Sequence, residues 1–446
     1  MAFHRVNIGN GIESWSVIGI AATGVISLNM SDIRQRIPTL PSKNGRSASS
    51  TGSTPSTSST LIRTKRAKVL KEPIDWLDEQ DRKRLVWGIA MLDVFSSFSS
   101  GTPLRIPISE IEFSSPFSTS IWMDGKRGSV LPQASLTADA FTYYTQIIKV
   151  FRGVHSFLAQ PRDISDKSAV GEWFVSFHQI ETEIREWKDA LPKKYRLLLD
   201  SNVLDVSESG TELPVLVLLH SAYNLALIKM HSSYGYPHVE SYVFRHSEQS
   251  KRICLSSVAN ITALVNQIVK ERSELIEYLG FHYGFCIWVC SRLLIVNSIF
   301  EQKDGNMVDK NDMNEKLTLF SNILKRIGKN SPACQKHHKI LKQLINLNMS
   351  VSNMIESEDD EQIAPSQAIA DMRIHTDLLT LILTNKLSEL EPGSVNPSAT
   401  DLQGLAMRYN LNDVSQENML LEGFQFDAKS DGFEDLFGYL DSNTKY

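Results

Sequence analysis

The spacing of apolar residues constrains the fold of this chain more than any other feature. Over long segments they recur every three to four positions, which lines one face of an α-helix, whereas the alternation typical of strands is scarce. This pattern predicts helices over residues 11–36, 75–98, 137–159, 168–190, 212–233, 247–270, 273–303, 311–328, 332–356 and 366–388. We therefore expect an all-α fold, with one large multi-helix domain.

The segment 75–98 gives the clearest helix signal. Asp75 is suited to cap its N-terminus, and further acids occupy its opening turns. Its apolar face is wide and includes Trp76, Trp87 and Phe95. The run Gly101-Thr102-Pro103 should end the helix, and residues 103–135 should form an extended connection rich in Pro and Ser.

Changes in composition divide the chain into parts. Ser, Thr, Gly and Pro dominate residues 38–60, which offer too few large apolar side chains to offset the entropy of ordering them. After Pro392 the composition turns polar again. We expect a helical piece of the domain at 1–37, a disordered and then basic linker at 38–72, the main helical domain at 73–391, and a mostly disordered acidic-aromatic tail at 392–446.

Overall composition limits the function classes. The chain has 446 residues, 42% of them apolar, enough to bury a sizeable core, and a formal net charge of −5 argues against a general binder of polyanions. Only four cysteines are present, which indicates a reducing compartment. The pattern favours a soluble protein of the cell interior.

The cysteines could in principle bind a metal. No CxxC pair occurs, and Cys286 and Cys290 are spaced i,i+4 in an apolar run, which favours two small buried side chains over a redox or metal pair. Cys334 precedes His337 and His338 at ligand-like spacing, but no second pair completes a tetrahedral site. We expect no metal bound by these residues.

Three apolar stretches raise the question of a membrane. The first, 15–28, lacks a strongly basic flank and a convincing cleavage site, and it is short for a bilayer. The stretches 213–230 and 279–300 are more hydrophobic but carry polar residues in their middles, namely His220 and Asn224, and His282 and Arg292. Buried helices of a soluble domain fit them better, so we expect no membrane association.

Catalytic motifs are missing from the sequence. There is no GxSxG, Walker loop, GxGxxG after a strand, HExxH or kinase set, and no nucleophile stands beside an evident base. The sequence therefore does not predict an enzyme, cofactor or catalytic residue.

One segment carries a recognisable signature, between residues 75 and 116. It reads Asp81-Arg82-Lys83-Arg84-Leu85-Val86-Trp87, then Met91-Leu92-Asp93, Gly101-Thr102-Pro103, Ile108-Ser109-Glu110-Ile111 and Ser115-Pro116. This resembles the fungal-specific transcription factor domain, the middle homology region of Zn₂Cys₆ regulators. The residues that match the family motif are Arg82, Lys83, Arg84, Trp87, Asp93, Gly101 and Pro103.

Weaker similarity extends the resemblance over roughly residues 11–300. Trp15 with Gly19-Ile20-Ala21 is similar to an earlier helix of the family, and residues 280–296 fit a later buried one. The chain departs from the family where Thr102 replaces an Arg and Val94 follows Asp93, and the family's first helices are expected upstream of Met1.

The resemblance implies a nuclear regulator of RNA polymerase II genes without catalysis. In the family, zinc is held by six cysteines near the N-terminus, a cluster that this sequence does not contain. We therefore expect no cofactor in this chain, and DNA contact only through a missing or partner module. A natural regulator without the cluster and a gene model that begins late both remain open.

Each part of the motif also has a purely structural interpretation. The triplet Arg82-Lys83-Arg84 could be a solvated face, or it could pair with acids of a neighbouring helix and fix the packing. Trp87 is expected in the core.

Two segments outside the motif bear on function. The basic residues Arg63, Lys65, Arg66 and Lys68 could form a nuclear import signal or a solvated linker. The tail places Phe424, Phe426, Phe433, Leu436 and Phe437 among acids, which suits a transactivation segment that binds a coactivator groove; a frayed terminus is the alternative.

Three functional hypotheses follow. The first is the regulatory and activating part of a transcription factor, with coactivators or the transcription machinery as partners and a homo- or heterodimer as an open question. The second is a helical interaction module that acts as a partner or dominant-negative of full-length regulators. The third is a helical enzyme or lipid-binding protein.

Overall fold

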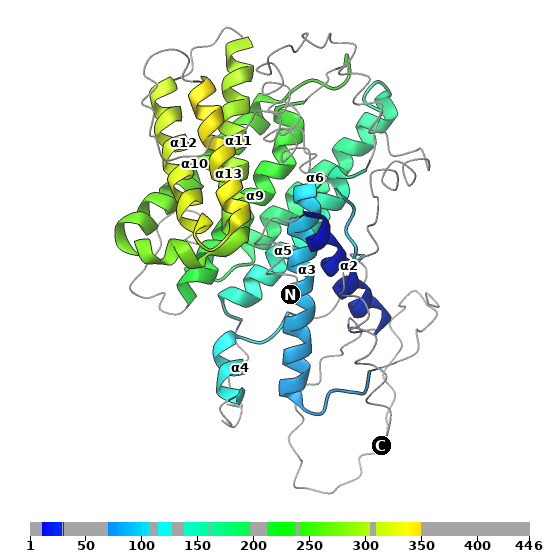
Figure 1. Ribbon diagram of the computed structural model, residues 1–446. Helices are drawn as coiled ribbons and strands as arrows, with labels where there is room; N and C mark the ends of the chain where they lie inside the picture. The colour runs from blue at the N-terminus through cyan, green and yellow to red at the C-terminus, as the bar shows by residue number, and fades with distance from the viewer. Residues whose placement is uncertain are drawn as a thin grey trace, which may run out of the picture. The chain divides into compact units, whose positions relative to one another are not determined.

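The computed structural model describes residues 11–28, 30, 70–100, 102–107, 115–126, 138–160, 163–196, 212–237, 241–303 and 309–348. Within these ranges every regular element is a helix, which confirms the all-α prediction. All of them belong to one compact unit (Figure 1). The predicted helix 366–388, the basic residues 63–68 and the tail 392–446 lie outside the described residues.

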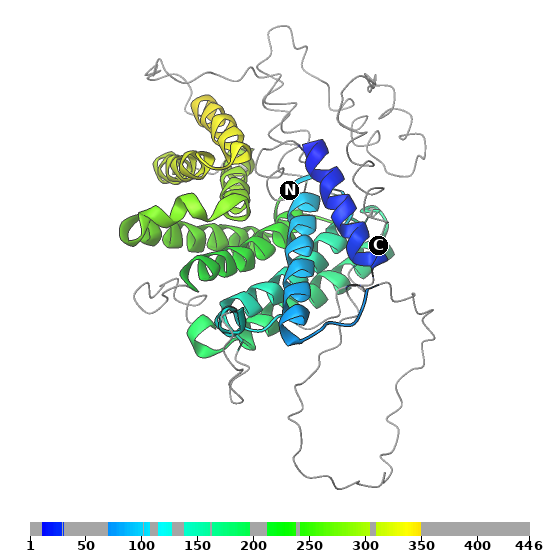
Figure 2. The same cartoon turned by 60° about the horizontal axis from the view of Figure 1, so that its bottom comes forward.

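The first helices carry the motif. α2 spans Gly11–Ser27 and α3 spans Trp76–Ser100, and both views show them running side by side (Figures 1 and 2). Asp75 caps α3 as predicted, because its carboxylate accepts the backbone N–H of Asp78 at 2.8 Å. α3 ends at Ser100, directly before the run that was expected to stop it.

The extended connection predicted for residues 103–135 is wrong in part. α4, Thr119–Lys126, forms a short helix there and packs beside α3. Ser118 begins it by accepting the N–H of Ile121 at 3.3 Å. A helix of this length is marginal alone, so its periodicity is weak and its contacts with α3 stabilise it.

The remaining helices form the body of the fold. α5 spans Ala140–Leu158, α6 Lys167–Asp189, α9 Leu213–Gly235 and α10 Glu248–Glu271. α12 spans Lys310–Gly328 and α13 Pro332–Asn348. α9 packs against both α5 and α10, while α12 packs against α13 and against α11, Gly280–Lys303. The predicted ranges agree to within a few residues, except that the end of the helix predicted over 332–356, residues 349–356, lies outside the described residues.

The single helix predicted over 273–303 is divided in two. A 3₁₀ segment, η3, covers Ser273–Tyr278, and α11 covers Gly280–Lys303. Gly280 joins them with φ at 70°, a left-handed conformation that a residue with a Cβ rarely adopts. The glycine therefore permits a change of direction that hydrophobic periodicity does not reveal.

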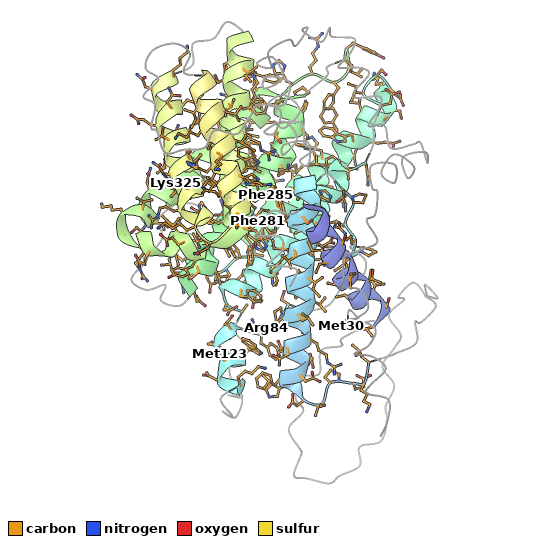
Figure 3. All side chains as sticks on the ribbon, in the orientation of Figure 1. Met30, Arg84, Met123, Phe281, Phe285 and Lys325 are labelled. Atoms are coloured by element: carbon orange, nitrogen blue, oxygen red, sulfur yellow. The ribbon has the colours of Figure 1, made fainter. Side chains whose placement is uncertain are left out.

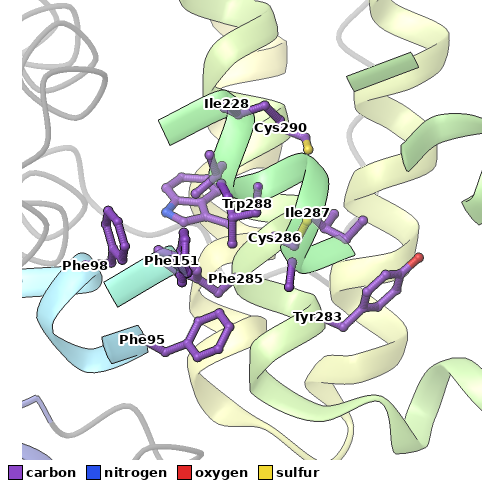
Figure 4. Packing of buried hydrophobic residues seen from close by; sticks show 14 of the residues in the cluster. Phe95, Phe98, Phe151, Ile228, Tyr283, Phe285, Cys286, Ile287, Trp288 and Cys290 are labelled. Carbon is purple, nitrogen blue, oxygen red and sulfur yellow. The ribbon is translucent and has the colours of Figure 1, made fainter. Parts of the chain in front are cut away.

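α11 lies at the centre of one continuous hydrophobic core. Its side chains pack with Phe95 and Phe98 of α3 and with Phe151 of α5 (Figure 4). The ring centroids of Phe98 and Phe151 are 4.3 Å apart, and those of Phe95 and Phe285 are 6.0 Å apart. The core thus joins α3, which carries the motif, to helices far downstream in the chain.

Candidate functional site around helix α3

The basic triplet on α3 is not a solvated face. Lys83 is fully buried, and its Nζ lies 2.6 Å from Oε1 of Glu79, which is also buried and one helical turn away. A buried ammonium without an opposite charge would be strongly unfavourable. This pair therefore lets α3 bury a charged stripe beside its apolar face.

Arg82 forms hydrogen bonds that connect α3 to the segment preceding it. Its Nε and Nη2 donate to the two carboxylate oxygens of Asp78 at 3.0 and 2.9 Å, and its Nη1 donates to the carbonyl of Lys71 at 2.7 Å. Burial opposes ionisation of Asp78, but the amide of Ile74 and the guanidinium outweigh it and hold the pKa of Asp78 below its usual value. A bidentate contact of this kind fixes orientation as well as charge.

Arg84 points toward α4 and holds it on α3 (Figure 3). Its guanidinium lies 4.5 Å from the ring centre of Trp122 and 5.0 Å from that of Phe141, and its Nη2 donates to the carbonyl of Phe117 at 2.7 Å. Burial lowers the pKa of Arg84, and nearby carboxylates partly counter this effect. The contact is a cation–π clamp across three segments.

Asp81 also connects α3 to α4. Its Oδ1 accepts a hydrogen bond from Nε1 of Trp122 at 2.7 Å, and its Oδ2 forms an ion pair with Nζ of Lys126 at 2.5 Å. From α3, Gln80 also accepts the backbone N–H of Phe117 at 2.7 Å. The motif residues of α3 therefore hold α4 at both ends.

The triplet was expected either to be solvated or to pair with acids of a neighbouring helix. Arg82 and Lys83 instead form ion pairs with acids on α3 itself, and Arg84 uses a carbonyl oxygen and aromatic rings. The triplet does fix packing, but by other partners than those predicted. Trp87 is buried in the core as expected.

Asp93 is the centre of a buried polar cluster. Its side chain is 0% exposed and accepts the backbone N–H groups of Arg105 and Ile106, each at 3.1 Å. Nη1 of Arg152 lies 3.3 Å from the same carboxylate, and Nη1 of Arg105 lies 3.6 Å away. The motif aspartate therefore has a structural role, because its carboxylate accepts hydrogen bonds from the backbone of the segment that follows α3.

Sequence reasoning missed Arg152. It is 1% exposed and donates from Nη1 to the carbonyl of Ala90 at 3.2 Å and from Nη2 to the carbonyl of Ile106. Burial lowers its pKa, while Asp93 opposes the shift. An arginine one turn after Ile148 and beside Phe151, on the buried face of α5, was the available signal.

His155 and Ser97 form further hydrogen bonds to the segment after α3. Nε2 of His155 donates to the carbonyl of Thr102 at 2.8 Å, and the hydroxyl of Ser97 donates to the carbonyl of Pro103 at 3.3 Å. Burial lowers the pKa of His155 to about 4, so the ring is neutral at pH 7 and Nε2 carries its proton. Gly101 lies outside the described residues, and Pro103 itself is exposed.

The four cysteines are buried and unbridged. This confirms the structural interpretation of Cys286 and Cys290. His337 stacks on Trp288 with ring centres 4.8 Å apart, and Nδ1 of His338 lies 2.9 Å from the hydroxyl of Ser321. Among the described residues, no three His, Cys, Asp or Glu side chains meet in an arrangement that could hold a metal ion.

One arrangement matches a hydrolase triad in residue types only. Nδ1 of His231 lies 3.1 Å from the hydroxyl of Ser250, and its Nε2 lies 3.8 Å from Oε1 of Glu181. The contact with Glu181 is too long for a hydrogen bond, and Ser250 and His231 are both buried. The hydroxyl therefore has no access for a substrate, and the group links α6, α9 and α10.

Three helices, α9, α10 and α11, are long and apolar enough to cross a membrane by length and composition. Most of the apolar stretch of α9 and of α11 is buried inside the fold, whereas less than half of that of α10 is buried. Of the polar residues noted in α9 and α11, His220, Asn224 and Arg292 are buried and His282 is half-buried, as expected for helices of a protein core.

Residues 41–189, a third of the chain, match the model of the family described as the fungal-specific transcription factor domain. The match contains α3, α4, α5 and α6, and hence Asp93 and Arg152. No curated protein and no solved structure matched the chain.

Proposed function

We propose that the protein regulates transcription by RNA polymerase II, a proposal based on the match of residues 41–189 to the fungal-specific transcription factor domain. It acts as the regulatory and activating part of a Zn₂Cys₆-type factor. The observation that carries the proposal is the family match, which spans the motif helix α3. Domains of this family are generally non-enzymatic and function in the nucleus.

The described geometry supports regulation rather than catalysis. Asp93, Arg152 and His155 are buried, and each makes hydrogen bonds that hold α3, α5 and the segment 102–106 together. Such groups set the relative positions of helices, so a partner that changes those positions would alter the whole unit.

DNA recognition is assigned to another module. A zinc cluster of the family type needs six cysteines, and this sequence has four, all of them buried in the helical unit. The module would lie on a partner chain or outside this sequence.

Activation is assigned to the tail. Phe424, Phe426, Phe433, Leu436 and Phe437 would enter a coactivator groove, with the acids keeping them in solution. The test is the full chain fused to an unrelated DNA-binding domain, with a reporter. Replacing the five residues by Ala should abolish activation, whereas replacing the exposed Val175 and Tyr242 by Ala should not. Full activity after the five substitutions would contradict the assignment.

Nuclear import is assigned to the basic residues Arg63, Lys65, Arg66 and Lys68. Changing all four to Ala in the full chain should shift a fluorescent fusion to the cytoplasm. The matched control removes four exposed lysines elsewhere, namely Lys149, Lys167, Lys193 and Lys270. Unchanged nuclear fluorescence of the first variant would refute this assignment.

A second function is favoured by the cysteine content alone. The chain would be a partner or dominant-negative of full-length regulators that do carry the cluster. Co-purification with such a regulator, and lower reporter expression from that regulator when this chain is overexpressed, would favour the dominant-negative function over the activating one.

A further inference from the structure

α2 is a helix whose own sequence favours helix formation weakly. It contains Gly19 and Gly24 between β-branched residues, which are poor helix formers. A helix of 17 residues is marginal in water even with good formers. Packing against the rest of the protein must therefore hold α2 in its helical form.

That packing depends on a narrow stripe. Ile18, Ala22 and Val25 are buried, at spacings of four and three, and α2 packs chiefly on α3. Met30 follows at the end of α2, beside α3 (Figure 3). On the other side of the helix, Ile20 is 74% exposed. Few anchors and one principal neighbour make α2 separable from the rest of the fold.

α2 also covers the polar cluster of the motif. A Cβ on Gly19 would lie 3.7 Å from Nε of Arg105, so the arginine side chain lies directly over this glycine. Arg105 is 23% exposed and pairs with Asp93 at 3.6 Å. A small residue at this position thus lets the arginine lie between α2 and the cluster.

The connection between α2 and α3 permits separation. Residues 31–69 lie between the two described segments, and Ser, Thr, Gly and Pro dominate the sequence from 38 to 60. A connection of this length and composition does not require α3 to move when α2 leaves.

We infer that α2 is a releasable cap, and that the surface of α3 and Arg105 beneath it is a docking site for a helix with the α2 pattern. The occupant is α2 of the same chain. Its release uncovers the Arg105–Asp93 pair and so connects the N-terminal segment to the motif. This inference goes beyond the proposed function and holds whatever genes the protein controls.

Hydrogen exchange on the full chain tests the inference. In the unaltered protein, the amides of α2 should exchange at least about tenfold faster than those of α5. Ile18→Asp should speed exchange further in α2 and leave α5 and α9 unchanged, because only the cap is lost. Ile20→Asp, at the exposed position, is the matched control and should change neither.

A peptide tests the docking surface directly. A fluorescent peptide of residues 11–30 should bind the full-length Ile18→Asp protein more tightly than the unaltered protein, in which the native α2 competes. The same peptide with Gly19→Leu should bind more weakly, since the added side chain must displace that of Arg105. Equal protection of α2 and α5 in the unaltered protein, or failure of the peptide to bind the variant, would overturn the inference.

Discussion

Asp93→Asn is the sharpest test of the polar cluster. The substitution keeps the shape of the side chain but removes the negative charge that faces Arg152 at 3.3 Å, with both groups within 1% of full burial. It also leaves one oxygen where two accepted the N–H groups of Arg105 and Ile106. A guanidinium then stays buried without its counter-charge.

The expected cost follows from the partners lost. Removing one member of a buried ion pair costs about 3–5 kcal/mol. The stability of a domain is about 5–15 kcal/mol, so the variant should lose a large fraction of it. Urea unfolding of the full chain, followed by far-ultraviolet circular dichroism, should show a lower midpoint with an unchanged slope.

Two further variants separate the charge from the general effect of substitution. Glu183→Gln makes the same change of carboxylate to amide on the exposed face of α6 and should move the midpoint little. Arg152→Met combined with Asp93→Asn should cost less than the sum of the single changes, with a coupling of about 1–3 kcal/mol. A stability loss below about 0.5 kcal/mol for Asp93→Asn would refute the reasoning, because surface substitutions have that effect.

Three other changes have defined outcomes. Arg84→Ala should release α4, shifting the emission of Trp122 to longer wavelength and costing about 1–3 kcal/mol of stability in urea titrations. His155, with its pKa lowered to about 4, is neutral in the fold but binds a proton when unfolded below about pH 6.5, so it contributes a fall in stability of about 3 kcal/mol as pH drops from 6.5 to 4. His220, His231 and His282 share this lowered pKa and add to the fall, so His155→Asn should remove only the share that His155 contributes. Gly284→Ala would place a Cβ 2.3 Å from a cysteine sulfur of α13 and should cost about 1–3 kcal/mol in thermal unfolding, whereas Gly153→Ala, with nothing within 4 Å, should be neutral or stabilising.

Hydrophobic periodicity was sufficient to predict most of this fold. The helices of the body were placed correctly because each buries one apolar face, and that periodicity is local information. α4 was missed because its stability comes from Arg84 and Asp81, which lie far away along the chain. The break at Gly280 was missed because the apolar pattern continues across it.

The site was only partly predictable for a related reason. The motif placed Asp93 and the basic triplet. Arg82 and Lys83 pair with acids on α3 itself, but the partners of Arg84 and Asp93 are backbone groups and side chains contributed by segments outside α3. Arg152 could be noticed only as a charge on the buried face of α5, and such a residue gives no indication of which carboxylate it meets. Which groups come together is set by tertiary packing, and a single sequence does not record it.

The core extends past the end of the family match, and this leads to a prediction about domain boundaries. The buried face of α5, within the match, packs on α9, and Phe95 of α3 stacks with His282 of α11 at 4.2 Å. A fragment of residues 41–189 would leave these apolar faces in water and should unfold in urea without a cooperative transition, whereas residues 1–348 should retain one. A cooperative transition of the shorter fragment, with a dependence on urea concentration suited to its size, would show that α9 and α11 are accessory to the domain. If the fragment shows no such transition, the folding unit is larger than the matched segment.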